Sequence, residues 1–426
     1  MCGIVGYLGK RPAVPLLLAG LRRLEYRGYD SAGVAVLNGK GVEVVKREGK
    51  LDILEAALAE VSPQGTTGIA HTRWATHGPP TRENAHPHTS NDGTISLIHN
   101  GIIENADALR TVLKEKGFVF HSQTDTEVVV HLIDHLWADG MSMEEAVAAA
   151  LRQVEGPYGI AVVSTRDRDK IVVARNGSPL LVGVGEDGEL MAGSDAAAVI
   201  AVTRDVVYLD DGDYAVLTPA GYAVHHLEAG PVDRGMSRVT WDLEEIEKGG
   251  YEHFMLKEIM EQPTSLRNVM RGRLLTEDGN ARLGGVSLSD WELSQIKRIV
   301  ITACGTSWHA ALVGEYLLEE LARIPVEVQY ASEFRYRNPV IEEGTLVMAI
   351  SQSGETADTL AALREAKQRG ALTMGVVNSV GSTIARETDF GVYLHAGPEI
   401  GVASTKAFTS QMVALTLFAL YVGRRR

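Results

Sequence analysis

The sequence predicts two domains of different fold class: an α+β domain of mixed sheet and helices, followed by an α/β domain with a doubly wound parallel sheet. Two observations support this division. Up to about Pro219, short apolar segments alternate with Gly, Asn and Asp, which is typical of strands joined by turns. From about Tyr251 onward, near-continuous apolar runs alternate with helical segments, which is typical of parallel strands buried on both faces.

In the predicted first domain, two helices and several strands can be assigned. The segment 14–24 carries leucines at helical spacing, and the segment 126–138 carries an apolar stripe behind an acidic first turn. The expected strands are the short apolar segments 3–8, 33–37, 94–99, 159–164, 170–175 and 214–217. We therefore expect a mixed sheet with helices packed on it.

The apolar pattern fades into Gly, Pro and charged residues between the two domains, in a range that includes the acidic run 242–247. We assign residues 1–220 to the first domain, 221–250 to a linker and 251–426 to the second domain. This second domain is expected to begin with a helix over 251–261 that stops at Pro263. Its parallel strands are predicted over 298–303, 345–350 and 372–377.

Composition and charge narrow the classes of function. A formal net charge of −14 argues against a nucleic acid or an anionic membrane as the main partner. No apolar run reaches the roughly 18 residues of a membrane span. The two cysteines, Cys2 and Cys304, lie far apart without metal-ligand spacing. We expect a cytoplasmic protein without a disulfide framework.

Cys2 directly follows Met1 and opens the run CGIVGY. Removal of Met1 would create an N-terminal residue with both a thiol and a free amine. Because an α-amino group has a pKa of about 7.7–8.0 and a thiol one of about 8.5, the amine can accept the thiol's proton near neutral pH. The alternative is that Cys2 is a small buried residue of the first strand. Position alone leaves both interpretations open.

Three polar clusters of the first domain contain side chains that a packed core avoids: RWATHG at 73–78, HNGIIEN at 99–105 and QTDTE at 123–127. The pair Asn100–Gly101 can supply an amide and a backbone N–H to an oxyanion, although Asn-Gly is also a common hairpin turn. Arg73 can clamp a carboxylate, and Asp125 can bind an ammonium unless it only caps the following helix. Such a site suits an amino acid whose side-chain carbonyl is attacked, and glutamine is the natural candidate.

Histidines crowd the same stretch: His71, His77, His86 and His88. A metal site is the rival interpretation of such crowding. It is disfavoured because no cysteine or clear acidic ligand joins the histidines at a regular spacing. We expect no metal and interpret these residues as structural or positioning groups.

In the second domain, two loops follow predicted strands: CGTS at 304–307 and SQSGET at 351–356. Both place hydroxyls and free N–H groups at the start of a helix, where phosphate binds readily. Helix capping by Ser307 and Thr356 is the alternative, but two loops at the carboxyl ends of adjacent strands favour phosphate. No nucleotide-binding motif is present in them. A third loop, 399–405, can close the pocket, and Lys406 after it is expected to be a solvated lysine.

These motifs together carry a resemblance to a known family. The segments CGIVG, LEYRGYDSAG at 24–33, RWATHG, HNGIIEN and QTDTE are similar to a class II glutamine amidotransferase domain of the N-terminal-nucleophile type, a layered α/β/β/α sandwich. The segments EHFMLKEIMEQP at 252–263, CGTS, SQSGET and GVASTKAFT at 401–409 resemble the first sugar isomerase (SIS) domain of the glutamine–fructose-6-phosphate aminotransferase family. The match covers essentially the whole chain.

The resemblance implies roles for individual residues. It makes Cys2 the nucleophile and Asn100 and Gly101 the oxyanion donors. The residues implied to hold glutamine are Arg73, Thr76, His77 and Asp125, with Trp74 as the gate of the ammonia passage and Arg27 near the nucleophile's amine. The residues implied to bind the sugar phosphate are Ser307, Ser351, Gln352, Ser353, Thr356, Val402 and Ser404.

The activity implied by the resemblance converts glutamine and fructose 6-phosphate to glutamate and glucosamine 6-phosphate, in hexosamine biosynthesis, without a cofactor and in a homodimer. The family also has a second SIS lobe that carries isomerase residues. We expect this chain to lack that lobe, and so to carry the glutaminase half and part of the sugar-phosphate site. A glutaminase-only fragment and a sugar-phosphate sensor are the alternatives. The intact nucleophile, oxyanion pair and clamp argue against a decayed sensor.

Overall fold

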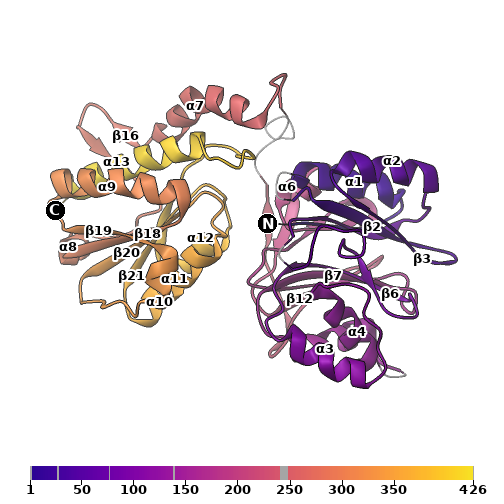
Figure 1. The fold of residues 1–426 in the computed structure, drawn as a ribbon. Coiled ribbons are helices and arrows are strands. Elements are labelled where there is room, and N and C mark those ends of the chain that lie inside the picture. The colour runs from indigo at the N-terminus through magenta and orange to yellow at the C-terminus, as the bar shows by residue number, and fades with distance from the viewer. Residues whose placement is uncertain (1, 26–27, 76, 138–139, 240–247, 426) are drawn as a thin grey trace. The chain divides into compact units, whose positions relative to one another are not determined.

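The computed structural model describes residues 2–25, 28–75, 77–137, 140–239 and 248–425. The chain forms two compact units, Met1–Thr240 and Trp241–Arg426 (Figure 1). The acidic run 242–247 lies outside the described residues.

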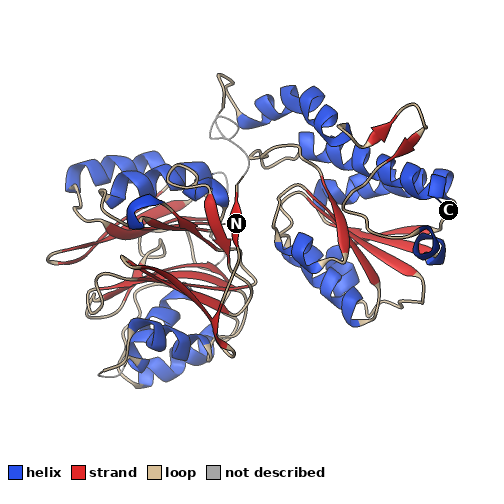
Figure 2. Cartoon of the chain, turned by 180° about the vertical axis from the view of Figure 1, so that it is seen from behind, coloured by secondary structure: helices blue, strands red, loops and turns tan. Residues whose placement is uncertain are grey.

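The first unit contains two antiparallel sheets that face each other (Figure 2). The order of the first sheet is β15 (Met236–Arg238), β11 (Asp205–Tyr208), β9 (Leu181–Val184), β10 (Leu190–Gly193), β1 (Gly3–Leu8), β4 (Thr67–Arg73), β2 (Ser31–Asn38) and β3 (Gly41–Glu48). The order of the second sheet is β14 (Gly230–Val232), β13 (Gly221–His226), β12 (Asp213–Thr218), β8 (Ile171–Asn176), β7 (Tyr158–Ser164), β6 (Ile95–Gly101) and β5 (His88–Thr89).

Helices cover the outer faces of these sheets and complete four layers, α/β/β/α (Figure 2). The helices beside the first sheet are α1 (Ala13–Leu24), α2 (Leu51–Val61) and the short α6 (Ala196–Val199), and those beside the second are α3 (Ala106–Glu115), α4 (Thr126–Leu136) and α5 (Met143–Leu151). A short turn of 3₁₀ helix spans Glu186–Gly188. Between the sheets lies a core of buried aliphatic side chains that includes Ile4, Ile69, Ile98 and Val173. The predicted α+β sandwich is confirmed.

The segment predicted as the start of a linker is part of the first unit. Strands β13 and β14 extend the second sheet beyond β12, and β15 pairs with β11 at the edge of the first sheet. The prediction of a linker from residue 221 was therefore wrong over 221–238. These strands are exposed on one side, so their polar composition resembles that of a linker.

The second unit is built on one parallel sheet in the order β19 (Val326–Tyr330), β18 (Arg298–Ala303), β20 (Thr345–Ser351), β21 (Leu372–Val377) and β22 (Phe390–Tyr393). One face packs against α7 (Phe254–Met270), α8 (Asp290–Gln295), α9 (Gly305–Ala322) and α13 (Lys406–Arg425). The other face packs against α10 (Ala331–Tyr336), α11 (Ala357–Gln368) and α12 (Thr383–Glu387). A small hairpin joins β16 (Leu274–Leu275) to β17 (Asn280–Ala281). The predicted doubly wound sheet is confirmed.

Helix α7 continues past Pro263, where the sequence predicted its end. A proline lacks the N–H that would bond the carbonyl four residues earlier, here that of Ile259. The side-chain amide of Gln262 donates to this carbonyl at 3.2 Å and replaces the missing bond. Beyond the proline, Ser265 and Val269 are buried, so tertiary packing keeps the helix intact.

Candidate active site

The pairing of two strands places Cys2 beside the end of β4. Gly3 on β1 is opposite Thr72 on β4, so Cys2 comes next to the segment that follows Arg73. The backbone N–H of Trp74 donates a hydrogen bond to Cys2 Sγ at 3.2 Å. Burial raises the pKa of the Cys2 thiol, while the Trp74 N–H and the charge of Arg73 act in the opposite direction. The thiol therefore needs a base in order to ionise at neutral pH.

Asn100 and Gly101 lie at the end of β6, next to Cys2. The Asn100 side-chain amide donates through Nδ2 to the carbonyl oxygen of Cys2 at 3.0 Å. Gly101 has a φ of +130°, a conformation that side chains rarely adopt, and an added Cβ would overlap the carbonyl oxygen of Pro157. The pair continues β6 alongside β7 and does not form the hairpin turn that was the alternative interpretation.

His71 fixes the orientation of the Asn100 amide. Its Nε2 lies 2.9 Å from Asn100 Oδ1, and its side chain is completely buried. Burial lowers the pKa of His71 to about 3, so the ring is neutral near pH 7. Because the amide oxygen can only accept, Nε2 carries the proton. His71 thereby directs Asn100 Nδ2 toward Cys2.

The residues implied to hold glutamine are partly brought together. Arg73 is buried, and its guanidinium donates to the backbone carbonyls of His77, Gly78 and Pro79, which fixes the loop after β4. His77 is exposed in that loop, and Thr76 lies outside the described residues. Trp74 is about half exposed, and its ring packs edge-on against Tyr29. The roles of these residues in binding glutamine stay predictions.

Asp125 connects the start of α4 to the loop behind Gly101. Its Oδ2 accepts the backbone N–H of Ile103 at 2.7 Å, and its side chain makes no capping hydrogen bond to α4. The alternative that Asp125 only caps the helix is therefore wrong. The binding of an ammonium group by Asp125 stays a prediction.

Sequence reasoning missed two features of this site: the part played by Asp30, and the contact of His71 with Asn100. The Asp30 carboxylate accepts the backbone N–H of Ala75, and its own N–H donates to the carbonyl of Arg73 at 3.2 Å. Asp30 thus holds the segment whose Trp74 N–H contacts the thiol. The signal was available, since Asp30 lies inside the motif LEYRGYDSAG, but a lone Asp gives no partner from sequence alone.

Three of the four crowded histidines, His71, His86 and His88, form a buried cluster next to Asn100, whereas His77 is exposed. The rings of His71 and His86 stack at 4.2 Å between centroids, and His88 meets His86 edge-on at 4.8 Å. His86 Nδ1 accepts the backbone N–H of His99, and His88 Nε2 lies 3.0 Å from Thr124 Oγ1. Burial lowers the pKa of both His86 and His88. In the part of the chain that the structure describes, no three His, Cys, Asp or Glu side chains are grouped to hold a metal ion.

In the second unit, the two Ser/Thr loops follow adjacent parallel strands, β18 and β20. Ser351 ends β20, and its Oγ accepts the N–H of Gly354 at 3.0 Å and lies 2.9 Å from Thr356 Oγ1. The alternative of ordinary capping by Ser307 and Thr356 was wrong for both loops. Thr356 is the N-cap of α11 but makes no capping bond, and Ser307 lies inside the first turn of α9.

The other implied sugar residues lie in the same loops and in the loop before α13. The backbone carbonyl of Gln352 accepts the backbone N–H groups of Asn378 and Ser379, and Ser353 Oγ accepts the backbone N–H of Glu355 at 3.2 Å. Val402 is 86% exposed, and Ser404 donates to Glu399 at 2.8 Å. Their contact with a sugar stays a prediction.

Lys406, at the first position of α13, is not the solvated lysine that the sequence predicted. It is 3% exposed, and its Nζ donates to Glu261 Oε2 at 2.6 Å. The partner is on α7, 145 positions away in sequence, so no local pattern could reveal it.

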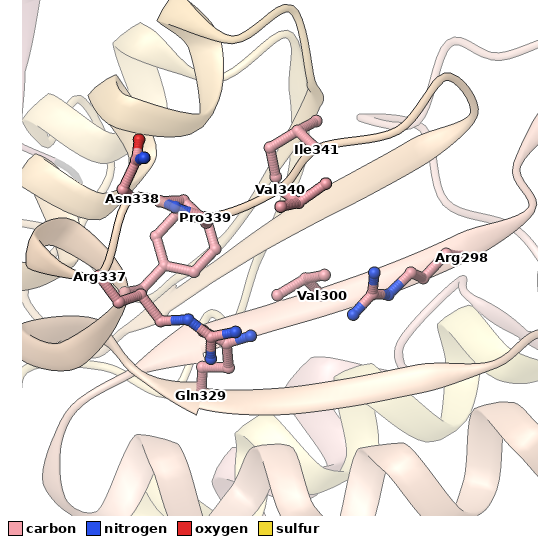
Figure 3. Close-up of a pocket in the computed structure, with 9 residues that line it drawn as sticks. Arg298, Val300, Gln329, Arg337, Asn338, Pro339, Val340 and Ile341 are labelled. Atoms are coloured by element: carbon pink, nitrogen blue, oxygen red, sulfur yellow. The ribbon is translucent and has the colours of Figure 1, made fainter.

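A cavity of about 270 Å³ lies elsewhere in the second unit (Figure 3). It is bounded by the first residue of β18, Arg298, and by the segment after α10, with Arg337 and Val340 on its rim (Figure 3). The phosphate loops are at the opposite, carboxyl ends of the strands, where open α/β sheets bind ligands. This cavity is therefore separate from the candidate sugar-phosphate site.

The fold and these sites define the class of the protein: an amidotransferase of the N-terminal-nucleophile type, joined to a sugar-isomerase unit. Family models support both parts, since a glutamine amidotransferase domain matches residues 71–201 and a SIS domain matches residues 292–421. A glutamine–fructose-6-phosphate aminotransferase (isomerizing) of Chlorobaculum tepidum is 58% identical over 100% of this chain and 70% of its own length. One of Thermus thermophilus is 53% identical over 100% of this chain and 69% of its own length. The chain therefore belongs to the glutamine–fructose-6-phosphate aminotransferase (isomerizing) family.

The C-terminal domain of glucosamine-fructose-6-phosphate aminotransferase from Francisella tularensis is 44% identical, with a TM-score of 0.40 over 42% of this chain and 50% of that one. A glutamine phosphoribosylpyrophosphate amidotransferase from B. subtilis is 18% identical, with a TM-score of 0.49 over 96% of this chain and 92% of that one. No helix in the described part of this chain is long and apolar enough to cross a membrane.

Proposed function

We propose that the first unit hydrolyses glutamine with Cys2 as the N-terminal nucleophile, and that the released ammonia serves amination of fructose 6-phosphate to glucosamine 6-phosphate. The observation that carries this proposal is the contact of Asn100 Nδ2 with the Cys2 backbone at 3.0 Å, with His71 fixing the amide. This contact supports the proposal because it brings a side-chain amide donor to the backbone of the residue that carries the thiol.

The proton balance of the reaction supports an N-terminal base. Because burial raises the pKa of the Cys2 thiol, the thiolate needs a nearby acceptor for its proton. After removal of Met1, the Cys2 amine is that acceptor, and the Trp74 N–H stabilises the thiolate at 3.2 Å. The thiolate attacks the side-chain carbonyl of glutamine, and Asn100 Nδ2 with the Gly101 N–H holds the developing oxyanion. The amine then returns the proton to the leaving ammonia, and water hydrolyses the thioester.

Residues around the thiol would select glutamine. We propose that Arg73, Thr76 and His77 bind its α-carboxylate end and that Asp125 accepts its ammonium, with Trp74 gating the exit of ammonia. In favour of this, the buried Asp125 carboxylate accepts the backbone N–H of Ile103, two residues after Gly101.

For the second unit we propose a fructose 6-phosphate site on the loops after β18 and β20. Its ligands are Ser307, Ser351, Gln352, Ser353 and Thr356, with Val402 and Ser404 beside the sugar. Hydroxyls and backbone donors at the starts of α9 and α11 suit a phosphate. We further propose a cytoplasmic homodimer, and the two free cysteines are consistent with a reducing compartment.

The test is an ammonia-release assay with glutamine, combined with an intact mass of the purified chain. We expect Cys2→Ala to lower turnover by at least about 10³-fold, because the nucleophile is lost. The matched control, Cys304→Ala, removes the other thiol and is expected to keep the wild-type rate. A chain that retains Met1 should be inactive, since the nitrogen of Cys2 is then part of a peptide bond and cannot act as a base. Equal ammonia release by wild type and Cys2→Ala would refute the proposal.

A further inference from the structure

The segment 252–263 is one of the motifs of the chain, but neither glutamine hydrolysis nor sugar-phosphate binding, as proposed above, assigns a role to it. In the structure it forms the start of α7, and two of its charged side chains are buried: Lys257 and Glu258. Buried charges are costly unless they are paired. Their partners therefore indicate what the motif does.

Glu258 holds the loop that precedes α13. Its Oε1 accepts the backbone N–H of Ile400 at 2.6 Å and that of Gly401 at 2.9 Å. A Cβ at position 401 would lie 2.5 Å from Glu258 Oε2, so only glycine lets the backbone approach this closely. Burial raises the pKa of Glu258, and the two N–H donors act against this shift.

A second anchor lies one turn further along α7. Glu261 accepts from Lys406 Nζ at 2.6 Å and pairs with Lys257 at 3.5 Å. Lys406 is the first residue of α13, so this ion pair fixes the far end of the same loop. Glu258 and Glu261, three residues apart, are on one face of α7 and bind the two ends of the loop, at Ile400–Gly401 and at Lys406.

The loop between these anchors contains Val402 and Ser404, which the proposed function places beside the sugar. Inside it, Glu399 accepts the N–H groups of Thr405 and Ala407 and the hydroxyl of Ser404. One turn into α13, the Gln411 amide donates to Ser307 Oγ at 2.9 Å. A contiguous set of hydrogen bonds therefore runs from α7 through the loop to the candidate phosphate site.

From these contacts we propose that Glu258 is a positioning residue that holds residues 400–405 in the conformation that binds the sugar phosphate. Glu261 supports it through Lys406. The proposal rests on the proposed function of the second unit, because it takes fructose 6-phosphate as the ligand. It predicts that the α7 carboxylates act on sugar binding and leave glutamine hydrolysis unchanged.

The experiment compares four versions of the full chain: wild type, Glu258→Met, Glu258→Gln and Arg267→Gln. Methionine keeps the volume of the side chain and removes both acceptor oxygens, whereas glutamine keeps one. Arg267 is exposed on the same helix and serves as the matched control for a lost charge. Three quantities are measured for each: the dissociation constant for fructose 6-phosphate, the hydrogen exchange rate of the amides in 399–405, and the glutaminase rate.

We expect Glu258→Met to weaken sugar-phosphate binding about tenfold and to speed exchange at Ile400 and Gly401, with an intermediate effect for Glu258→Gln. Arg267→Gln and all glutaminase rates should match wild type. Unchanged exchange at Ile400 and Gly401, or unchanged sugar binding, in a folded Glu258→Met would overturn the inference while the proposed function stands. If wild type and Ser351→Ala bind fructose 6-phosphate equally or not at all, the proposed sugar site fails and this inference fails with it.

Discussion

Replacement of Gly101 by alanine tests the geometry of the oxyanion site. Gly101 has a φ of +130°, and an added Cβ would overlap the carbonyl oxygen of Pro157. That oxygen also accepts the backbone N–H of Ile102 at 3.0 Å, so it cannot move away without the loss of a hydrogen bond. The backbone dihedral angles of residue 101 must therefore change in the variant, and the N–H of residue 101 no longer points toward the oxyanion.

The expected loss follows from two separate effects of Gly101→Ala. Strain at a positive φ costs about 1–3 kcal/mol of folding stability. Loss of one aligned oxyanion donor lowers kcat by about 10²–10³-fold. The control is Gly93→Ala, because Gly93 also has a positive φ, +71°, but no atom lies within 4 Å of its added Cβ. The control should lose stability without losing activity.

The assay measures kcat for ammonia release and the melting temperature of both variants. We predict a large fall of kcat only for Gly101→Ala, at a temperature where both variants are folded. If Gly101→Ala keeps kcat within about threefold of the Gly93→Ala value, the donor role assigned to position 101 is refuted.

Three further predictions concern His71, the buried histidines and the phosphate loop. His71→Phe should lower the glutaminase kcat about tenfold or more, since the Asn100 amide loses the partner that orients it, whereas equal kcat values would contradict this orientation. Burial lowers the pKa of His71 to about 3, so as the pH falls below about 6.5 this histidine is protonated in the unfolded state and stays neutral in the folded state. The free energy of unfolding from urea titrations should therefore drop by about 2 kcal/mol per such histidine between pH 6.5 and 5. A free energy of unfolding that stays constant over this range would contradict the burial of neutral histidines. Ser351→Ala should weaken fructose 6-phosphate binding about tenfold by calorimetry, because Gly354 N–H and Thr356 Oγ1 lose their common partner, and wild-type affinity would argue against this loop as the phosphate site.

The sequence was sufficient to predict features that depend on local periodicity. The strands at 3–8 and 298–303 were expected from apolar runs and are found as β1 and β18. The helix end at Pro263 was wrong because a side-chain amide, that of Gln262, replaces the missing donor. The linker after residue 220 was wrong because β13 and β14 extend the second sheet from β12 to its edge, where much of their surface is exposed and carries polar residues.

The candidate site shows the same limit more sharply. Motifs predicted roles for Cys2, Asn100 and Gly101 from the chemistry of the residue types, and the structure brings Asn100 into contact with Cys2. The residues that orient or pair with these groups could not be predicted, since their contacts join positions far apart in the sequence: His71 to Asn100, and Lys406 to Glu261. Such partners are fixed by strand register and helix packing, and a sequence pattern gives neither.

The account depends most directly on Cys2 Sγ as the atom that is acylated. A reaction with glutamine is quenched in acid at steady state, and the chain is digested and mapped by mass spectrometry for a γ-glutamyl thioester. We predict an adduct on an N-terminal peptide that begins with Cys2. Ammonia release with no adduct on that peptide, or with the adduct on the peptide that contains Cys304, would contradict the account.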